Sequence, residues 1–430
     1  MSNFITFGCW NRGNCNPGRE LSNPLSRVIA KMDSYIPTLK MGPSFVCIAG
    51  DNYYPHIAGK GADKKKYLSI PDLRSGFECL SKFQKRHRDI PIDIIAGNHD
   101  TEGTKKMIVT QIPGLPPVTE PCIITKAEIE YTSDPMNFTM FNYRVMRNTL
   151  VIMIDSNIYC EKITAAELEC YALLVEHTLS KLNLPQLHDG TSITSVSQLK
   201  AIQLAWLENM YDVIRDDKTE FKNVMIVAHH PLALYKIKEE KSRYEIVKAD
   251  YLGFCYSIYH YLKTLYGAVH LFYSCADLHT YQSGIVTINF GGAPITINQE
   301  IAGTGGTELE EKNADFECAA KYEHDDERKR TSASLVKYRM TKIDHNHGFL
   351  HWSHNKTGML SAMFVPVDSE SGSASASESG SGSGSASRSA SRSAREGGTK
   401  RRRQRTSKRR RQRTFKRGRS KRQRRSRSRH

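Results

Sequence analysis

Residues 45–54 read FVCIAGDNYY and residues 92–100 read IDIIAGNHD. Each stretch is a short apolar run, of the length and composition of a strand, that breaks into a glycine and a group of polar side chains. Ligands of open α/β sheets bind beyond the carboxyl ends of the strands, where such polar groups gather. The two stretches therefore predict an α/β fold with a site made from strand ends.

The same pattern recurs outward along the chain, where apolar runs alternate with segments of helical period, as in α/β domains. Three more runs end in polar clusters, namely GCWN at 8–11, AHHP at 228–231 and ADLH at 276–279. We predict strands at Phe4–Phe7, Phe45–Ala49, Ile92–Ala96, Leu150–Ile154, Val224–Ala228, Val269–Tyr273, Ile285–Asn289, Leu335–Met340 and Phe349–His354. We predict helices at Asp72–Arg88, Ala165–Leu182 and Ser197–Arg215.

Charge and composition divide the chain into three segments. Residues 1–367 form the predicted globular domain, 368–398 a flexible Ser/Gly/Ala-rich linker, and 399–430 a disordered Arg-rich tail. The formal net charge is +17, yet residues 371–430 alone hold 22 Lys and Arg against two acidic residues, or +20. The remainder is close to neutral, so any attraction to a polyanion belongs to the tail.

The tail contains a tandem octamer, RRRQRTSK at 401–408 and RRRQRTFK at 409–416. It lacks a run of aromatic platforms, so we expect contact with the phosphates of DNA or RNA through charge, without base readout. A nuclear-targeting or solubilising role is the simpler interpretation, and it is compatible with binding to DNA or RNA. The arginines that we assign to nucleic-acid binding are Arg401, Arg402, Arg403, Arg409, Arg410 and Arg411.

The ten cysteines are scattered without a CxxC pair, and the first residues, MSNFITFGCW, do not resemble a secretory signal. No window approaches eighteen apolar residues, so we expect no membrane span. These features predict reduced thiols in an intracellular protein, cytoplasmic or nuclear, that is not secreted. Association with a virion-type particle is a further possibility for the same protein. The oligomeric state cannot be read from the sequence.

The polar clusters are weak signals one by one, but their order along the chain is informative. Asp51, Asn98, His99, His229 and His279 bring carboxylate, amide and imidazole groups from four strand ends. Divalent and trivalent metals accept such a mixture of oxygen and nitrogen donors. Two ions that share one carboxylate can clamp a phosphate and activate water.

With these motifs the sequence resembles the calcineurin-like metallophosphoesterases, and within them the purple acid phosphatases, whose motifs run GDxG, GDxxY, GNH(D/E), a His before Pro, and GHxH. The resemblance spans Phe4 to Gln282 and includes QLAWLENM at Gln203–Met210, where these enzymes carry a helix. It implies a calcineurin-like α/β sandwich of two packed, mixed β-sheets flanked by helices. It also implies a phosphatase or phosphodiesterase that uses two ions, Fe, Zn or Mn, and a metal-activated hydroxide.

Residue by residue, the resemblance implies that Asp51 bridges the two ions and that Tyr54 binds the first as a phenolate. His279 would bind the first ion as well. Asn98 and His229 would bind the second.

Two further residues of GNHD are expected to act in catalysis. His99 would face the substrate, as proton donor to the leaving oxygen or as a clamp on the phosphate. Asp100 would orient an imidazole, with the N-cap of a helix as an equal alternative.

Two positions depart from the family pattern. GCWN places Cys9 where the family has its first aspartate, and ADLH places Asp277 where it has the first histidine. Both residue types bind zinc or iron, although Cys9 can equally be a small buried hydrophobe. We favour Asp277 as a ligand because a buried carboxylate without a partner is costly. The alternative function is a catalytically weakened member that binds nucleic acid or a virion through its tail.

Overall fold

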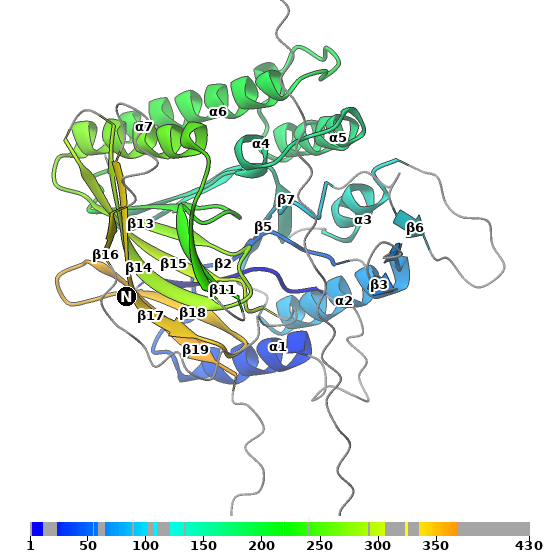
Figure 1. Ribbon diagram of the computed structural model, residues 1–430, viewed down its shortest axis with the longest axis horizontal. Coiled ribbons are helices and arrows are strands. Elements are labelled where there is room, and N and C mark those ends of the chain that lie inside the picture. The colour runs from blue at the N-terminus through cyan, green and yellow to red at the C-terminus, as the bar shows by residue number, and fades with distance from the viewer. Residues whose placement is uncertain are drawn as a thin grey trace, which may run out of the picture. The chain divides into compact units, whose positions relative to one another are not determined.

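The structure, a computed structural model, is a mixed α/β fold in which helices flank mixed β-sheets, as the sequence predicts (Figure 1). It describes residues 2–11, 24–54, 56–58, 65–87, 90–101, 107–109, 121–132, 135–217, 219–238, 241–290, 293–305, 323–325 and 335–367. The predicted linker and tail lie outside the described residues, so these boundaries stay predictions. Every predicted strand and helix overlaps an observed element.

The first large sheet contains the strands of both stretches, 45–54 and 92–100, from which the α/β fold was predicted. Its six strands have the order β19-β18-β1-β2-β5-β7. Strands β1, β2, β5 and β7 run parallel, whereas β18 and β19 are antiparallel additions at one edge. The bounds are β1 Asn3–Phe7, β2 Val46–Ala49, β5 Ile92–Ile95, β7 Met136–Thr139, β18 Gly348–His354 and β19 Leu360–Pro366.

The second large sheet has eight strands in the order β16-β17-β14-β15-β13-β10-β9-β8, with β9, β10, β13 and β15 parallel. The bounds are β8 Asn142–Met146, β9 Thr149–Met153, β10 Asn223–Val227, β13 His270–Cys275, β14 Tyr281–Asn289, β15 Ile295–Ala302, β16 Glu323–Asp325 and β17 Leu335–Asp344. Two small sheets join β11 Ala233–Lys238 with β12 Lys241–Ile246, and β3 His56–Ala58 with β4 Lys65–Leu68 and β6 Met107–Val109.

Helices cover the outer faces of the sheets. Figure 1 shows α6 and α7 on one side of the strands and α1 and α2 on the other. Capping boxes start α5 at Thr164 and α6 at Ser195, each side chain accepting from the backbone three residues on. The bounds are α1 Pro24–Tyr35, α2 Ile70–Arg86, α3 Ile123–Tyr131, α4 Asn157–Cys160, α5 Ala165–Lys181, α6 Val196–Asp216 and α7 Ala249–Tyr266.

The inner faces of the two large sheets pack against each other. Alternate residues of the central strands point inward, for example Cys47 on β2 and Met225 on β10, which belong to one buried cluster. A hydrogen bond joins Thr6 on β1 to Ser274 on β13, with 2.9 Å between the hydroxyl oxygens. This packing brings the carboxyl ends of strands from both sheets to the same end of the domain.

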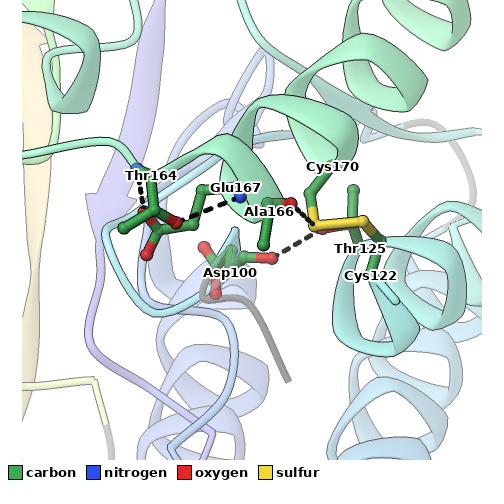
Figure 2. Close-up of a disulfide and its surroundings, with 7 residues drawn as sticks. All are labelled: Asp100, Cys122, Thr125, Thr164, Ala166, Glu167 and Cys170. Carbon is green, nitrogen blue, oxygen red and sulfur yellow. Dashed lines mark hydrogen bonds between the residues drawn. A yellow bond between two sulfur atoms is a disulfide. The ribbon is translucent and has the colours of Figure 1, made fainter. Parts of the chain in front are cut away.

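The prediction that the cysteines are reduced is wrong for at least three of them, including the bonded pair drawn in Figure 2. Cys122, at the start of α3, and Cys170 on α5 form a disulfide, with their Cα atoms 5.0 Å apart. Cys79 is disulfide-bonded as well. Spacing along the chain did not reveal the pairing because the partners lie 48 residues apart and meet only when the helices pack. Among the described residues no helix has the length and apolar character needed to cross a membrane.

Candidate metal centre

The loops that leave β1, β2, β5, β10 and β13 come together at one end of the packed sheets. Gly8 donates its N–H to the carbonyl of Ala302 at 3.1 Å, and Ala276 donates to the carbonyl of His229 at 3.0 Å. A Cβ on Gly8 would stand 2.6 Å from the Cβ of Ala276, so glycine is required where the two sheets approach. Contacts between backbone atoms therefore hold the ends of these strands close together.

Asp51 lies at the centre of these loops, and its two carboxylate oxygens face different partners. Oδ2 accepts a hydrogen bond from the phenol of Tyr54 and lies 3.9 Å from the Sγ of Cys9. Oδ1 accepts from the backbone N–H of His99 at 3.2 Å and lies 3.3 Å from Nε2 of His229. Asp51 thus stands between two groups of side chains.

His229 organises one of these groups. Its Nδ1 lies 2.9 Å from the carbonyl oxygen of Ala49 and donates to it, which turns Nε2 toward the cluster. Nε2 lies 3.2 Å from Oδ1 of Asn98 and 3.8 Å from Oδ1 of Asp277. The Asp277 side chain is 30% exposed, so the burial on which its assignment was based is wrong, and the contact with His229 is what places it at the site.

Tyr54 organises the other group. Its hydroxyl lies 3.0 Å from Nε2 of His279. Its ring packs against the ring of His99, with 4.9 Å between the centroids. His99 is partly exposed, whereas Tyr54 and Asp51 are buried. The imidazole of His99 therefore lies at the boundary between the buried cluster and solvent.

The seven side chains expected to bind metal thus form two sets around Asp51. We call Cys9, Tyr54 and His279 the first donor group, and Asn98, His229 and Asp277 the second donor group. Ligating atoms of Cys9, Asp51 and His229 all lie within 4.8 Å of one another. Cys9 is fully buried and hydrogen-bonds Asp51, so the thiol has a polar partner and is more than an apolar filler.

Three residues of the cluster adopt backbone conformations that are uncommon for side chains other than glycine. Cys9, Asp51 and Asp277 have φ angles of 52°, 53° and 56°. Such left-handed conformations are costly and are kept where the surrounding structure enforces them, often at functional sites. Here each one directs a side chain from a strand end into the cluster.

The protonation states follow from burial and from the charge of Asp51. Burial would raise the pKa of Asp51, but the charges of His229 and His99 outweigh it and hold that pKa well below its usual range. Burial lowers and Asp51 raises the pKa of His229, which settles at about 10. Burial and then Asp51 raise the pKa values of Cys9 and Tyr54. At neutral pH the cluster therefore holds protons that a metal ion would have to displace.

We expect the affinity of the protein for Zn²⁺ to rise with pH, and binding to release protons. The raised pKa values of Cys9, Tyr54 and His229 mean that these groups keep their protons to higher pH, so protons compete with the ion most strongly in acid. Calorimetric titrations between about pH 6 and about pH 8, in buffers of different ionisation enthalpy, measure both effects. An affinity that is independent of pH would contradict this expectation.

Asp100 does neither of the things that the sequence suggested. Its carboxylate is buried and accepts hydrogen bonds from the backbone and side-chain amides of Asn52, both at 2.8 Å, and from the backbone of Gly97 at 2.6 Å. Among the described residues it bonds no imidazole and caps no helix. Asp100 instead ties the loop of Asp51 to the loop of Asn98.

His230, the second histidine of AHHP, is buried. Its Nδ1 lies 2.9 Å from the hydroxyl of Ser156, and its Nε2 lies 3.1 Å from a carboxylate oxygen of Glu161. Both ring nitrogens are thus engaged within the protein. Sequence reasoning missed Ser156 and Glu161 because they follow β9, a strand end without a recognisable motif.

Comparisons with known proteins show only a limited similarity. No family model matches the chain, and no curated protein does. Among solved structures, "Structure of PhoD" aligns with a TM-score of 0.39 and 10% identity over 82% of this chain, and the chain spans 63% of that protein. The phosphopantetheinyl hydrolase PptH from Mycobacterium tuberculosis aligns with a TM-score of 0.28 and 9% identity, over 69% of this chain and 88% of that one.

Proposed function

We propose that the protein is a metal-dependent phosphoesterase of the purple-acid-phosphatase-like kind, a phosphatase or phosphodiesterase with two metal ions. The observation that carries this proposal is the position of Asp51, whose two oxygens face two separate donor groups. A carboxylate in this position can bridge two ions.

The donors present fit such ions. With Asp51 counted in each set, the first and second donor groups offer four ligands apiece, the number that zinc takes in most protein sites. Thiolate, phenolate, imidazole, amide and carboxylate also suit iron, and all but the thiolate suit manganese. When bound, the ions would polarise a phosphate oxygen and lower the pKa of a water molecule.

The protein side chains would divide the remaining tasks. His99 is partly exposed beside Tyr54, where its imidazole can donate a proton to a leaving oxygen or a hydrogen bond to the phosphate. Asp277 in place of the family's histidine adds one negative charge to the ligands, whereas a Cys9 thiolate in place of the aspartate leaves the charge unchanged. Extra anionic ligands reduce the charge that an ion exerts on water, so we expect a less acidic optimum than in the family.

The test is metal content together with hydrolysis. The full chain, loaded with zinc, manganese or iron, is expected to bind two ions per molecule and to hydrolyse an aryl phosphate monoester or a bis-aryl diester. Faster hydrolysis of the monoester would indicate a phosphatase, and faster hydrolysis of the diester a phosphodiesterase. Chelation should remove activity, and the ion should restore it. Failure to bind any of the three metals would refute the proposal.

A second function is favoured by the charge of the tail. We propose that Arg401, Arg402, Arg403 and Arg409–Arg411 bind DNA or RNA phosphates, since residues 371–430 carry +20 next to a nearly neutral body. This function would persist in a protein whose catalysis is weakened at Cys9 and Asp277, so the two activities are separable by experiment.

A further inference from the structure

The loop that follows β10 carries His229 and is buried. Strand β10 lies between β9 and β13 and ends at Val227. Beyond this end stand His229, which is 0% exposed, and His230, which is 7% exposed. Buried peptide groups need hydrogen-bond partners, and regular pairing with the neighbouring strands supplies none past the end of a strand. The loop therefore depends on other groups of the protein for its backbone hydrogen bonds.

Two buried hydroxyl groups serve the backbone of His230. Its N–H donates to the hydroxyl of Ser156 at 3.0 Å, and its carbonyl oxygen accepts from the hydroxyl of Tyr273 at 2.6 Å. Ser156 lies in the loop after β9 and Tyr273 lies on β13, and both are 0% exposed. His230 is thus held from both strands that flank β10.

Both hydroxyls are committed to this loop. Ser156 occupies the N-cap of α4, where a serine side chain usually accepts from the first turn of the helix, yet it makes no capping bond. It contacts the backbone and the ring of His230 instead. The hydroxyl of Tyr273 is oriented in turn by that of Tyr251 on α7, with 2.7 Å between the two oxygens.

The peptide group that joins His229 to His230 sets the direction of the metal-binding imidazole. Its carbonyl oxygen accepts from the N–H of Ala276 at 3.0 Å, and its N–H is the one that donates to Ser156. Nε2 of His229 lies 3.3 Å from Oδ1 of Asp51. A rotation of this peptide group would therefore move Nε2 away from the carboxylate with which it is to share an ion.

We propose that Ser156 and Tyr273 are positioning residues of the metal centre, whose hydroxyls fix the loop after β10 and thereby direct the imidazole of His229 toward Asp51. The inference rests on the proposed metal-dependent function, in which His229 is a ligand. Groups that orient a metal-binding histidine usually bond its ring, as the carbonyl of Ala49 does here. Ser156 and Tyr273 act on the backbone beside it.

The test removes one oxygen atom at a time, with Ser156→Ala and Tyr273→Phe in the full chain. Tyr259→Phe is the matched control, because Tyr259 on α7 is equally buried and its hydroxyl also donates to a backbone carbonyl, that of Phe272 on β13. We expect Ser156→Ala and Tyr273→Phe each to bind Zn²⁺ about 10-fold more weakly, the lower end of the range for groups that orient metal ligands. Tyr259→Phe should bind Zn²⁺ as the wild type does.

Thermal unfolding of the same variants separates positioning from stability. Tyr273→Phe and Tyr259→Phe each lose one buried hydroxyl bond, so we expect similar decreases in Tm. Only Tyr273→Phe should also lose affinity for Zn²⁺. Equal losses of affinity in these two variants would overturn the proposal, since they would show that general destabilisation weakens the site.

A further readout needs no metal. Hydrogen exchange of the metal-free protein should show faster exchange of the His230 amide in Tyr273→Phe, although that variant keeps the hydroxyl of Ser156 as acceptor. Tyr259→Phe should leave this rate unchanged. Wild-type affinity in both Ser156→Ala and Tyr273→Phe, or a wild-type exchange rate of His230 in Tyr273→Phe, would overturn the proposal.

Failure of the proposed function gives a different result. A wild-type protein that binds no zinc, manganese or iron would refute the metal-dependent function, and with it the role of both hydroxyls at a metal centre. The exchange rate of His230 would still decide whether Tyr273 holds the loop after β10.

Discussion

Replacing Asp51 with asparagine is expected to abolish binding of the two-ion set and to reduce phosphoester hydrolysis by more than about 100-fold. Residues that merely orient metal ligands cost 10 to 100-fold when changed, and Asp51 would itself touch both ions. Asparagine keeps the size of the side chain but offers one neutral oxygen in place of two charged ones. The measurements are metal content after dialysis and turnover of an aryl phosphate.

Asp155→Asn is the matched control for this prediction. Asp155 is also fully buried, and burial raises its pKa to about 6. It accepts from the backbone of Asn157 and belongs to neither donor group. We expect this variant to keep its ions. Retention of most activity by Asp51→Asn, or equal losses in both variants, would exclude a bridging role for Asp51.

Truncation after Asp368 is expected to lower the affinity for long DNA or RNA by at least about 10³-fold at low salt, with hydrolysis of a small phosphoester unchanged. The deletion removes residues 369–430, which hold 22 Lys and Arg against three acidic residues, or +19, and leaves a nearly neutral body. Each phosphate that Lys or Arg neutralises releases counterions, and about 6–10 such contacts change affinity by about 10³ to 10⁵ between about 50 and 200 mM salt.

The measurement is binding of both chains to duplex and single strands across a salt series. A full-length chain in which Arg401–Arg403 and Arg409–Arg411 are replaced by glutamine keeps the length of the tail and should show a smaller salt slope than the wild type. If the truncated chain binds as tightly and with the same slope, the body has a basic groove of its own. That result would favour a nuclease over a simple phosphatase.

The motif-bearing strands could be predicted because each is an apolar run with a clear end. The runs 45–49 and 92–96 appear as β2 and β5, and both are followed by residues of the cluster. Helices α1, α3, α4 and α7 were not predicted. Helix α7, with the sequence ADYLGFCYSIYHYLKTLY, is rich in aromatic residues with low helix propensity, so its packing against the sheet decides its conformation.

At the candidate site, too, some features could be predicted from the sequence and others depend on tertiary packing. GDNYY, GNHD and AHHP indicated which residue types would gather at strand ends, but not that the two oxygens of Asp51 face different partners. Asp100 was noticed as a polar residue beside a ligand, yet its partners Asn52 and Gly97 depend on how two loops meet.

The sequence by itself determined the α/β class, the strand ends that carry the polar side chains, and a charge of +20 confined to the last 60 residues. These properties are local, because they depend on residue type and on periods of a few positions. The tertiary structure alone decided the grouping of the donors around Asp51, the Cys122–Cys170 disulfide and the hydrogen bonds of Asn52 to Asp100. Each of these joins residues distant in sequence, and such contacts exist only after the sheets and helices have packed.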